Sequence, residues 1–235
     1  MGYSPYYIYI LFKRYSKELV EINSGPIIFG IGNIMRNKAS FKGLKSGKNL
    51  ESIYNKIAEK KGIKKVNQIN MPLVIPTVDI ANGKEYVITN KIPEDGENKE
   101  QYITDISVGK AVRASSSFPA VFSPCEFKNH AFMDGGALDN IPVHEVKKQG
   151  ADKVIAVKFD ADPITKDSNI MDIVMKTIDI MGSKISEESL EMSDLVLNVY
   201  TDKVGLLDTE KLDSCYKYGY ECVMQNLEKI KELLL

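Results

Sequence analysis

The sequence predicts one α/β domain with three layers, in which helices cover both faces of a mainly parallel central sheet. Three observations support this fold class. Apolar residues recur at helical spacing in several separate segments. Short runs rich in β-branched residues lie between those segments. No Pro-, Gly- or Ser-rich linker divides the 235 residues, of which 43% are apolar, so the chain can bury one good core. We therefore expect a single domain over residues 1–235.

Two helices are expected in the first quarter of the chain. Ser4 followed by Pro5 is typical of a helix start, because a serine hydroxyl caps the first turn and proline fits the first helical position. Apolar residues then recur at helical spacing as far as Ile22. Residues 50–58 show the same spacing, and Gly62 is the expected stop. The segment between the two helices is irregular.

The middle of the chain changes to strand-like patterns. Residues 73–80 and 85–89 are rich in β-branched residues and flank Asn82 and Gly83, which predicts a β-hairpin with a type I′ turn. The small residues of 107–117 predict a short helix that packs closely on its neighbours.

The second half is expected to alternate between strands and helices. Residues 130–134 read as a short strand, a helix follows as far as Gly150, and residues 154–159 read as a buried parallel strand. Two further helices are expected near 170–181 and 209–234. We expect the strands at 73–79, 131–133 and 154–159 to share the mainly parallel sheet.

Composition excludes some classes of protein. The formal net charge is −1 and the pI is about 6.2, so no overall basic field indicates a nucleic-acid-binding protein, and no nucleic acid partner is expected. Cys125, Cys215 and Cys222 form no even set of disulfides, which favours a reducing, cytoplasmic location. The apolar run at residues 8–12 is too short to span a bilayer.

The most informative stretch is residues 111–143, which read AVRASSSFPAVFSPCEFKNHAFMDGGALDNIPV. It contains A-S-S-x-x-P at the end of the expected small-residue helix, and then D-G-G running into N-x-P. D-G-G alone is ordinary turn chemistry. This ordered pair resembles the second half of the patatin-like phospholipase domain, and the resemblance covers nearly the whole chain.

The resemblance implies hydrolysis of lipid esters by a serine and aspartate pair that works without histidine. By its place in D-G-G, Asp134 matches the aspartate, the general base that accepts the serine proton. Gly135 and Gly136 would let the chain turn sharply beside it. The reaction implied needs no cofactor and no metal. The alternative is that Asp134 only caps a turn.

The chain departs from the family at the nucleophile, because no serine stands in G-x-S-x-G and no glycine-rich oxyanion loop is present. Ser4 lies in G-Y-S-P-Y, which lacks the closing glycine. Ser115, Ser116 and Ser117 match a family segment that does not supply the nucleophile. We therefore expect the sequence to lack the N-terminal strand-helix-strand unit of the domain, and to be inactive alone.

Parts of the sequence are also compatible with other functions. His130, Asp134, Asp139 and His144 could suggest a metal site, although such residues are often part of a solvated loop. A non-catalytic patatin-like protein that binds lipid or a protein partner is the second hypothesis, and a start codon placed too late or a split gene is the third.

A membrane contact is expected at residues 23–48, where apolar residues alternate with a local basic cluster. The alternative is a lid or core loop whose lysines lie in water. The expected partner is a lipid ester, with peripheral membrane contact. Head group, acyl length and oligomeric state are left open.

Overall fold

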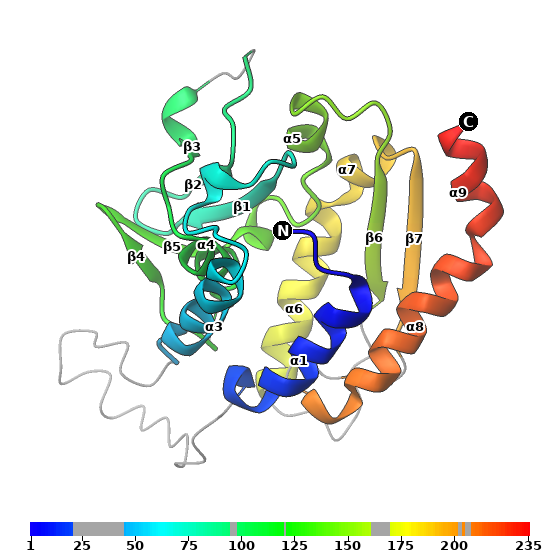
Figure 1. Cartoon of the computed structure of the whole chain (residues 1–235), viewed down its shortest axis with the longest axis horizontal. Helices are drawn as coiled ribbons and strands as arrows, with labels where there is room; N and C mark the ends of the chain where they lie inside the picture. Colours follow the sequence, from blue (N-terminus) through cyan, green and yellow to red (C-terminus); the bar gives the residue numbers. More distant parts are fainter. Residues whose placement is uncertain (21–44, 95–97, 120, 161–169, 202–203, 205–207) are drawn as a thin grey trace.

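The computed structural model describes residues 1–20, 45–94, 98–119, 121–160, 170–201, 204 and 208–235. Its strands lie in two sheets with helices around them (Figure 1). The larger sheet has the strand order β3-β2-β1-β5-β4. Its members are β1 (Val74–Asp79), β2 (Lys84–Thr89), β3 (Tyr102–Ile103), β4 (Cys125–Phe127) and β5 (His130–Asp134). The smaller sheet pairs β6 (Ile155–Asp160) with β7 (Leu195–Tyr200).

The α/β class is confirmed, but the expected single, mainly parallel sheet is wrong for the described residues. In the larger sheet β1 is antiparallel to β2 and β5, and β4 is antiparallel to β5, while β2 and β3 are parallel. The reason is the length of the connections: four residues join β1 to β2 and two join β4 to β5, too few for the crossover that parallel strands require. The parallel pair β6–β7 forms a separate sheet, and β7 was not predicted.

The predicted hairpin of β1 and β2 is confirmed, but its turn is not type I′. Gly83 has φ 68°, whereas Asn82 is not among the described residues with positive φ, and type I′ needs both. Asp79 pairs with Lys84, so the loop holds four residues and closes with a bond of 2.8 Å from the Gly83 N–H to the Asp79 carbonyl.

The expected helix starts and stops follow local chemistry. The Tyr7 N–H donates to the Ser4 hydroxyl, and the Lys110 N–H donates to the Ser107 hydroxyl. Gly62 has φ 72° beyond the end of the second helix. The described α-helices are α1 (Pro5–Val20), α3 (Lys48–Glu59), α4 (Val108–Ser115), α5 (Val143–Lys148), α6 (Ile170–Ile185), α7 (Glu187–Glu191), α8 (Leu212–Gln225) and α9 (Leu227–Leu234).

The main core lies between the larger sheet and α4. Ile88 of β2, Phe132 of β5 and Ala111 of α4 are fully buried in one cluster. Leu197 and Val199 of β7 pack separately against α8. In Figure 1 the larger sheet, α3 and α4 lie on the left, and β6, β7, α8 and α9 lie on the right.

The segment expected to contact a membrane, residues 23–48, lies mostly outside the described residues, which resume at Lys45. No helix in the described ranges is both long enough and apolar enough to cross a bilayer.

Candidate active site

Asp134 is the last residue of β5 and begins the 3₁₀ turn η3 (Gly135–Ala137). Its carboxylate Oδ1 accepts a hydrogen bond of 2.9 Å from the Gly136 N–H. Its own N–H donates to the Ser117 carbonyl oxygen at 3.2 Å, and Thr77 of β1 is its partner in the sheet register. The residue is therefore fixed at the end of β5, beside β1 and the start of η3.

Gly135 is required by space, whereas Gly136 faces the ends of two side chains. A Cβ on Gly135 would lie 2.4 Å from the carbonyl oxygen of Pro76 in β1. A Cβ on Gly136 would lie 2.9 Å from Oδ1 of Asn140 and 3.1 Å from Oδ1 of Asp134. Neither glycine has a positive φ, so at Gly135 the close approach of the β1 backbone, and not a left-handed conformation, excludes a side chain.

Burial changes the chemistry of the Asp134 carboxyl group. Burial raises its pKa above the ordinary value, and the hydrogen bond from the Gly136 N–H offsets part of that rise. Within the described residues no other hydrogen bond reaches this carboxylate. Asp134 is therefore a stronger base than a solvated aspartate, with one oxygen held by the backbone and the other available to a proton donor.

The nearby serines lie at the end of α4. The Ser117 hydroxyl is buried and donates to the Arg113 carbonyl oxygen at 2.7 Å, so its proton is engaged in the helix end. Ser116 is exposed and Ser115 is half-buried. Ser4 lies at the start of α1 and accepts the cap hydrogen bond there. None of these serines lies on a strand-to-helix elbow.

The residues of the metal hypothesis are divided between separate interactions. His130 stands at the opposite end of β5 from Asp134, with its Nδ1 2.8 Å from Oδ2 of Asp79. Asp139 and His144 lie beyond η3 and in α5. The described residues contain no group of three or more His, Cys, Asp or Glu side chains placed to bind a metal.

Sequence reasoning missed the pair of Asp79 and His130. Asp79 is 2% exposed, and burial alone would raise its pKa. Hydrogen bonds from His130 and from the N–H groups of Ala81 and Ala131 outweigh burial and hold the pKa of Asp79 below its ordinary value. The pair ties the last residue of β1 to the first residue of β5, at the opposite end of β5 from Asp134. The turn at Asp79 and the histidine 51 residues later gave no local signal of their contact.

The turn after Asp134 is covered by α6, a contact that sequence reasoning also missed. A Cβ on Gly182 of α6 would lie 3.9 Å both from the Gly136 carbonyl oxygen and from Nδ2 of Asn140. A glycine in a long apolar helix is the one sequence feature that indicates such a close approach.

Comparison with known proteins gives a family match. A family model described as patatin-like phospholipase matches residues 7–147, more than half of the chain. The chain is 27% identical over 168 residues to a protein of Invertebrate iridescent virus 6 named "Probable lipid hydrolase 463L". It is 28% identical over 135 residues to "Lysophospholipase NTE1" of Scheffersomyces stipitis, and 46% identical over 46 residues to the protein of the same name in Debaryomyces hansenii.

These relatives are longer than the matched region. The viral alignment covers 67% of this chain and 53% of the viral protein, and the Scheffersomyces alignment covers 46% of this chain and 9% of that protein. The Debaryomyces alignment covers 20% of this chain and 3% of the relative. The chain thus spans about half the length of the viral relative.

Proposed function

Because the chain belongs to the patatin-like phospholipase family, we propose that it takes part in hydrolysis of the carboxylic esters of lipids, with Asp134 as the general base. The names of the relatives, a probable lipid hydrolase and lysophospholipases, support a lipid ester as substrate. The observation that carries the proposal is the setting of Asp134, a half-buried carboxylate at a strand end with one oxygen held by the Gly136 N–H.

The proposed chemistry needs a serine hydroxyl within hydrogen-bond reach of Asp134. In that arrangement Asp134 takes the hydroxyl proton as the serine oxygen attacks the ester carbonyl carbon, and passes it to the alcohol that leaves. Water, giving its proton to Asp134, then attacks the acyl-serine, and the acid leaves as the serine oxygen regains that proton. Burial strengthens the base for this transfer. None of the 235 residues provides a serine in G-x-S-x-G, so the proposal places the nucleophile outside this sequence.

The test compares three proteins in the hydrolysis of a short-chain aryl ester. They are the 235-residue chain, the same chain extended by the residues that its gene encodes upstream, and the extended chain carrying Asp134→Asn. We expect the first to be inert and the second to be active. The third should be slower by roughly 10² to 10⁴, because the general base is lost.

Asp139→Asn in the extended chain is the matched control. Asp139 lies five residues further on and is not part of D-G-G. Its pKa is also raised, mainly by burial and to a smaller extent by the negative charge of Glu145. Its activity should stay close to that of the unchanged protein. Asp134-dependent turnover by the 235-residue chain would contradict the placement of the nucleophile and direct mutagenesis to residues 115–117.

A non-catalytic role in lipid or protein binding is the second candidate, favoured by the lack of G-x-S-x-G in this sequence. A folded extended chain that is inert on every lipid ester tested would establish this role over hydrolysis.

We also propose peripheral membrane contact through residues 23–48 and a cytoplasmic location. The basic and apolar composition of that segment supports the first proposal. The three cysteines, all unpaired, support the second.

A further inference from the structure

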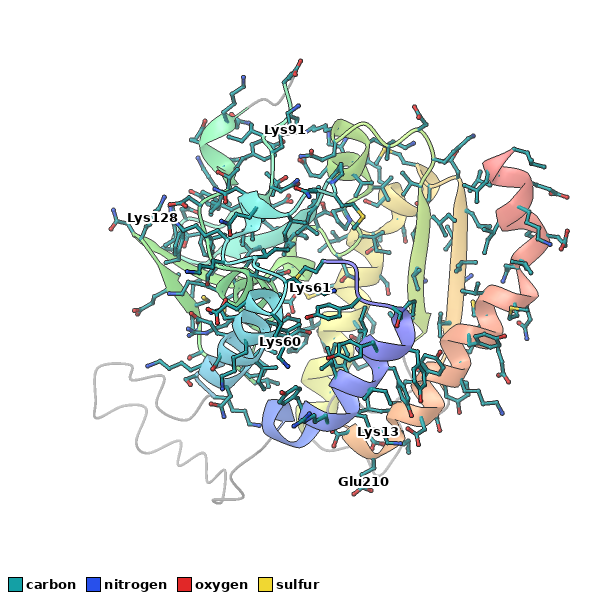
Figure 2. The ribbon with its side chains drawn as sticks, viewed as in Figure 1. Lys13, Lys60, Lys61, Lys91, Lys128 and Glu210 are labelled. Carbon is teal, nitrogen blue, oxygen red and sulfur yellow. The ribbon has the colours of Figure 1, made fainter. Side chains whose placement is uncertain are left out.

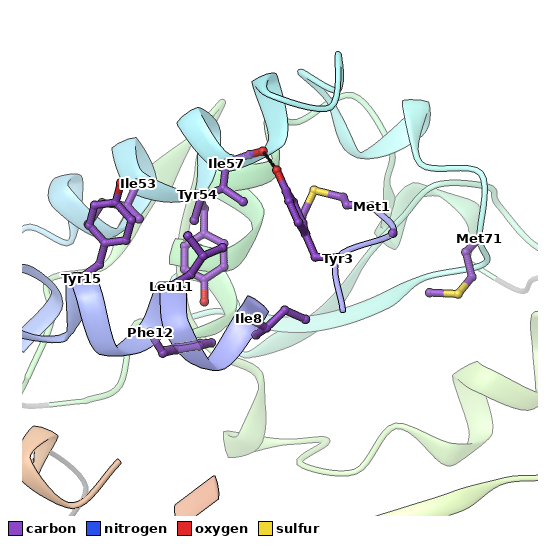
Figure 3. Close-up of a pocket in the computed structure, with 11 residues that line it drawn as sticks. Met1, Tyr3, Ile8, Leu11, Phe12, Tyr15, Ile53, Tyr54, Ile57 and Met71 are labelled. Atoms are coloured by element: carbon purple, nitrogen blue, oxygen red, sulfur yellow. Dashed lines mark hydrogen bonds between the residues drawn. The ribbon is translucent and has the colours of Figure 1, made fainter. Parts of the chain in front are cut away.

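A cavity of about 310 Å³ lies between α1 and α3. Figure 3 shows Leu11 of α1 facing Tyr54 and Ile57 of α3, with Met71 at the far side, and Phe12 also lines the cavity. Its walls are almost entirely aliphatic and aromatic. The volume is within the range of small-molecule sites, which start at about 300 Å³. The cavity shares no lining residue with the surroundings of Asp134 described above.

Tyr54 is one of three tyrosines that line this apolar space. The Tyr54 side chain reaches from α3 toward α1 (Figure 3). Burial raises the pKa of the Tyr54 phenol. Among the described residues this hydroxyl has no hydrogen-bond partner, whereas the Tyr3 hydroxyl donates to the Ile57 carbonyl oxygen at 3.0 Å.

A positive charge lies next to one of the lining residues, Tyr3. The Lys61 ammonium lies 4.6 Å from the centre of the ring of Tyr3, which lines the cavity. Figure 2 shows Lys60 and Lys61, the two lysines that follow α3, beside α1. No ion pair joins Lys61 to a carboxylate in the part of the chain that the structure describes. The site thus combines an apolar interior with a cation at its edge, which is complementary to an anion that carries one hydrocarbon chain.

We propose that this cavity binds the hydrocarbon chain of a fatty acid anion, with the carboxylate beside Lys61. The proposal takes its lipid chemistry from the function proposed above. The binding proposal is tested by binding measurements alone. Lack of ester hydrolysis would therefore not contradict fatty acid binding, and lack of fatty acid binding would not contradict ester hydrolysis.

The first measurement is calorimetric titration of the 235-residue chain with octanoate, decanoate and dodecanoate below their micelle concentrations. Each methylene group buried should tighten binding about fourfold. Decyltrimethylammonium, which has the same chain length and the opposite charge, should bind more weakly than decanoate. Lys61→Gln should weaken decanoate binding by roughly twofold to fivefold, the effect of an exposed ion pair, and leave the ammonium compound unaffected. Lys60→Gln is the control.

The second experiment fills the cavity with a larger side chain and repeats the titrations. Ile8 and Ile10 are both on α1 and are 41% and 38% exposed, but only Ile8 lines the cavity. Ile8→Trp should abolish the chain-length dependence, and Ile10→Trp should preserve it. Because the chain contains no other tryptophan, fluorescence of the introduced residue reports the folding of both variants. Met71→Trp, at a lining residue that is 67% exposed, replaces Ile8→Trp if that variant does not fold.

Three results would overturn the proposal. They are affinities independent of chain length, equal binding by the Ile8 and Ile10 variants, and self-association of the chain that Ile8→Trp abolishes, which would make the occupant a second copy of the chain.

Discussion

Glu85 of β2 has a strongly raised pKa. Its Oε1 is buried without a hydrogen-bond partner. Burial and, after it, the negative charges of Asp139 and Glu145 raise its pKa from 4.5 to about 7, while Lys148 of α5 acts in the opposite direction. The group is therefore protonated in the folded protein over a range of pH in which the unfolded chain has released the proton.

This shift predicts a loss of stability as pH rises. Glu85 contributes its full stabilisation below about pH 4.5 and loses it as pH rises through about 7, because the raised pKa belongs to the folded state. We expect the unfolding free energy to fall between pH 5 and pH 8 by on the order of 1 kcal/mol more in the unchanged protein than in Glu85→Gln, after a discount for partial exposure. Urea denaturation at several pH values measures this difference.

The control is Glu126→Gln, which changes an exposed glutamate of β4 in the same way. It should keep the pH dependence of the unchanged protein. Equal slopes for the Glu85 variant and the unchanged protein would show that Glu85 ionises normally.

At the scale of elements, α3 and α4 pack with almost no space between their backbones. A Cβ on Gly109 would lie 2.0 Å from the Glu51 carbonyl oxygen, and the Gly109 N–H donates to Oδ1 of Asn55 at 2.8 Å. An ion pair of 3.1 Å between Arg113 and Glu51 joins the same two helices. The small residues of α4 therefore set the distance between the helices.

Gly109→Ala should reduce the unfolding free energy by about 1–3 kcal/mol, because α3 must move away from α4. Gly219→Ala is the matched control within α8, since nothing lies within 4 Å of the added Cβ. That change should raise the unfolding free energy by about 0.5–1 kcal/mol, because alanine favours a helix interior. Thermal unfolding of both variants shows whether close packing or helix propensity controls stability at each glycine. An increase in the unfolding free energy of Gly109→Ala would disprove the close contact between α3 and α4.

At the scale of the whole molecule, a net charge of −1 provides no general attraction to an anionic surface. The proposed membrane contact therefore depends on a local cluster, and Arg36, Lys38, Lys42, Lys45 and Lys48 lie within the segment 23–48. We expect co-sedimentation with anionic vesicles to exceed that with neutral ones. Lys38→Gln with Lys42→Gln should weaken anionic binding by roughly 30-fold, at about 1 kcal/mol per lysine.

The matched double variant is Lys84→Gln with Lys229→Gln, which changes the net charge equally at exposed positions outside the segment. It should bind nearly as well as the unchanged protein. Equal losses in the two double variants, or equal binding to neutral and anionic vesicles, would exclude the segment as the membrane contact.

Several features of the chain were determined by sequence alone, because they depend on residues close together along it. The Ser4-Pro5 helix start, the glycine stop at Gly62 and the hairpin around Gly83 each follow from local backbone preferences. The strand that ends at Asp134 follows from its pattern and from the resemblance to a family. The order A-S-S-x-x-P and then D-G-G was specific enough to predict the family that the comparison shows.

Other features were decided only by the tertiary structure, because each depends on groups far apart in sequence. The carbonyl of Pro76 excludes a side chain at Gly135, and Asp79 meets His130 across 51 residues. Sheet direction also escaped prediction, since runs of β-branched residues show that strands exist but not how they pair. Burial of Asp134 and the cavity between α1 and α3 likewise exist only once separate elements have packed, because desolvation and enclosed volume are properties of the assembled chain.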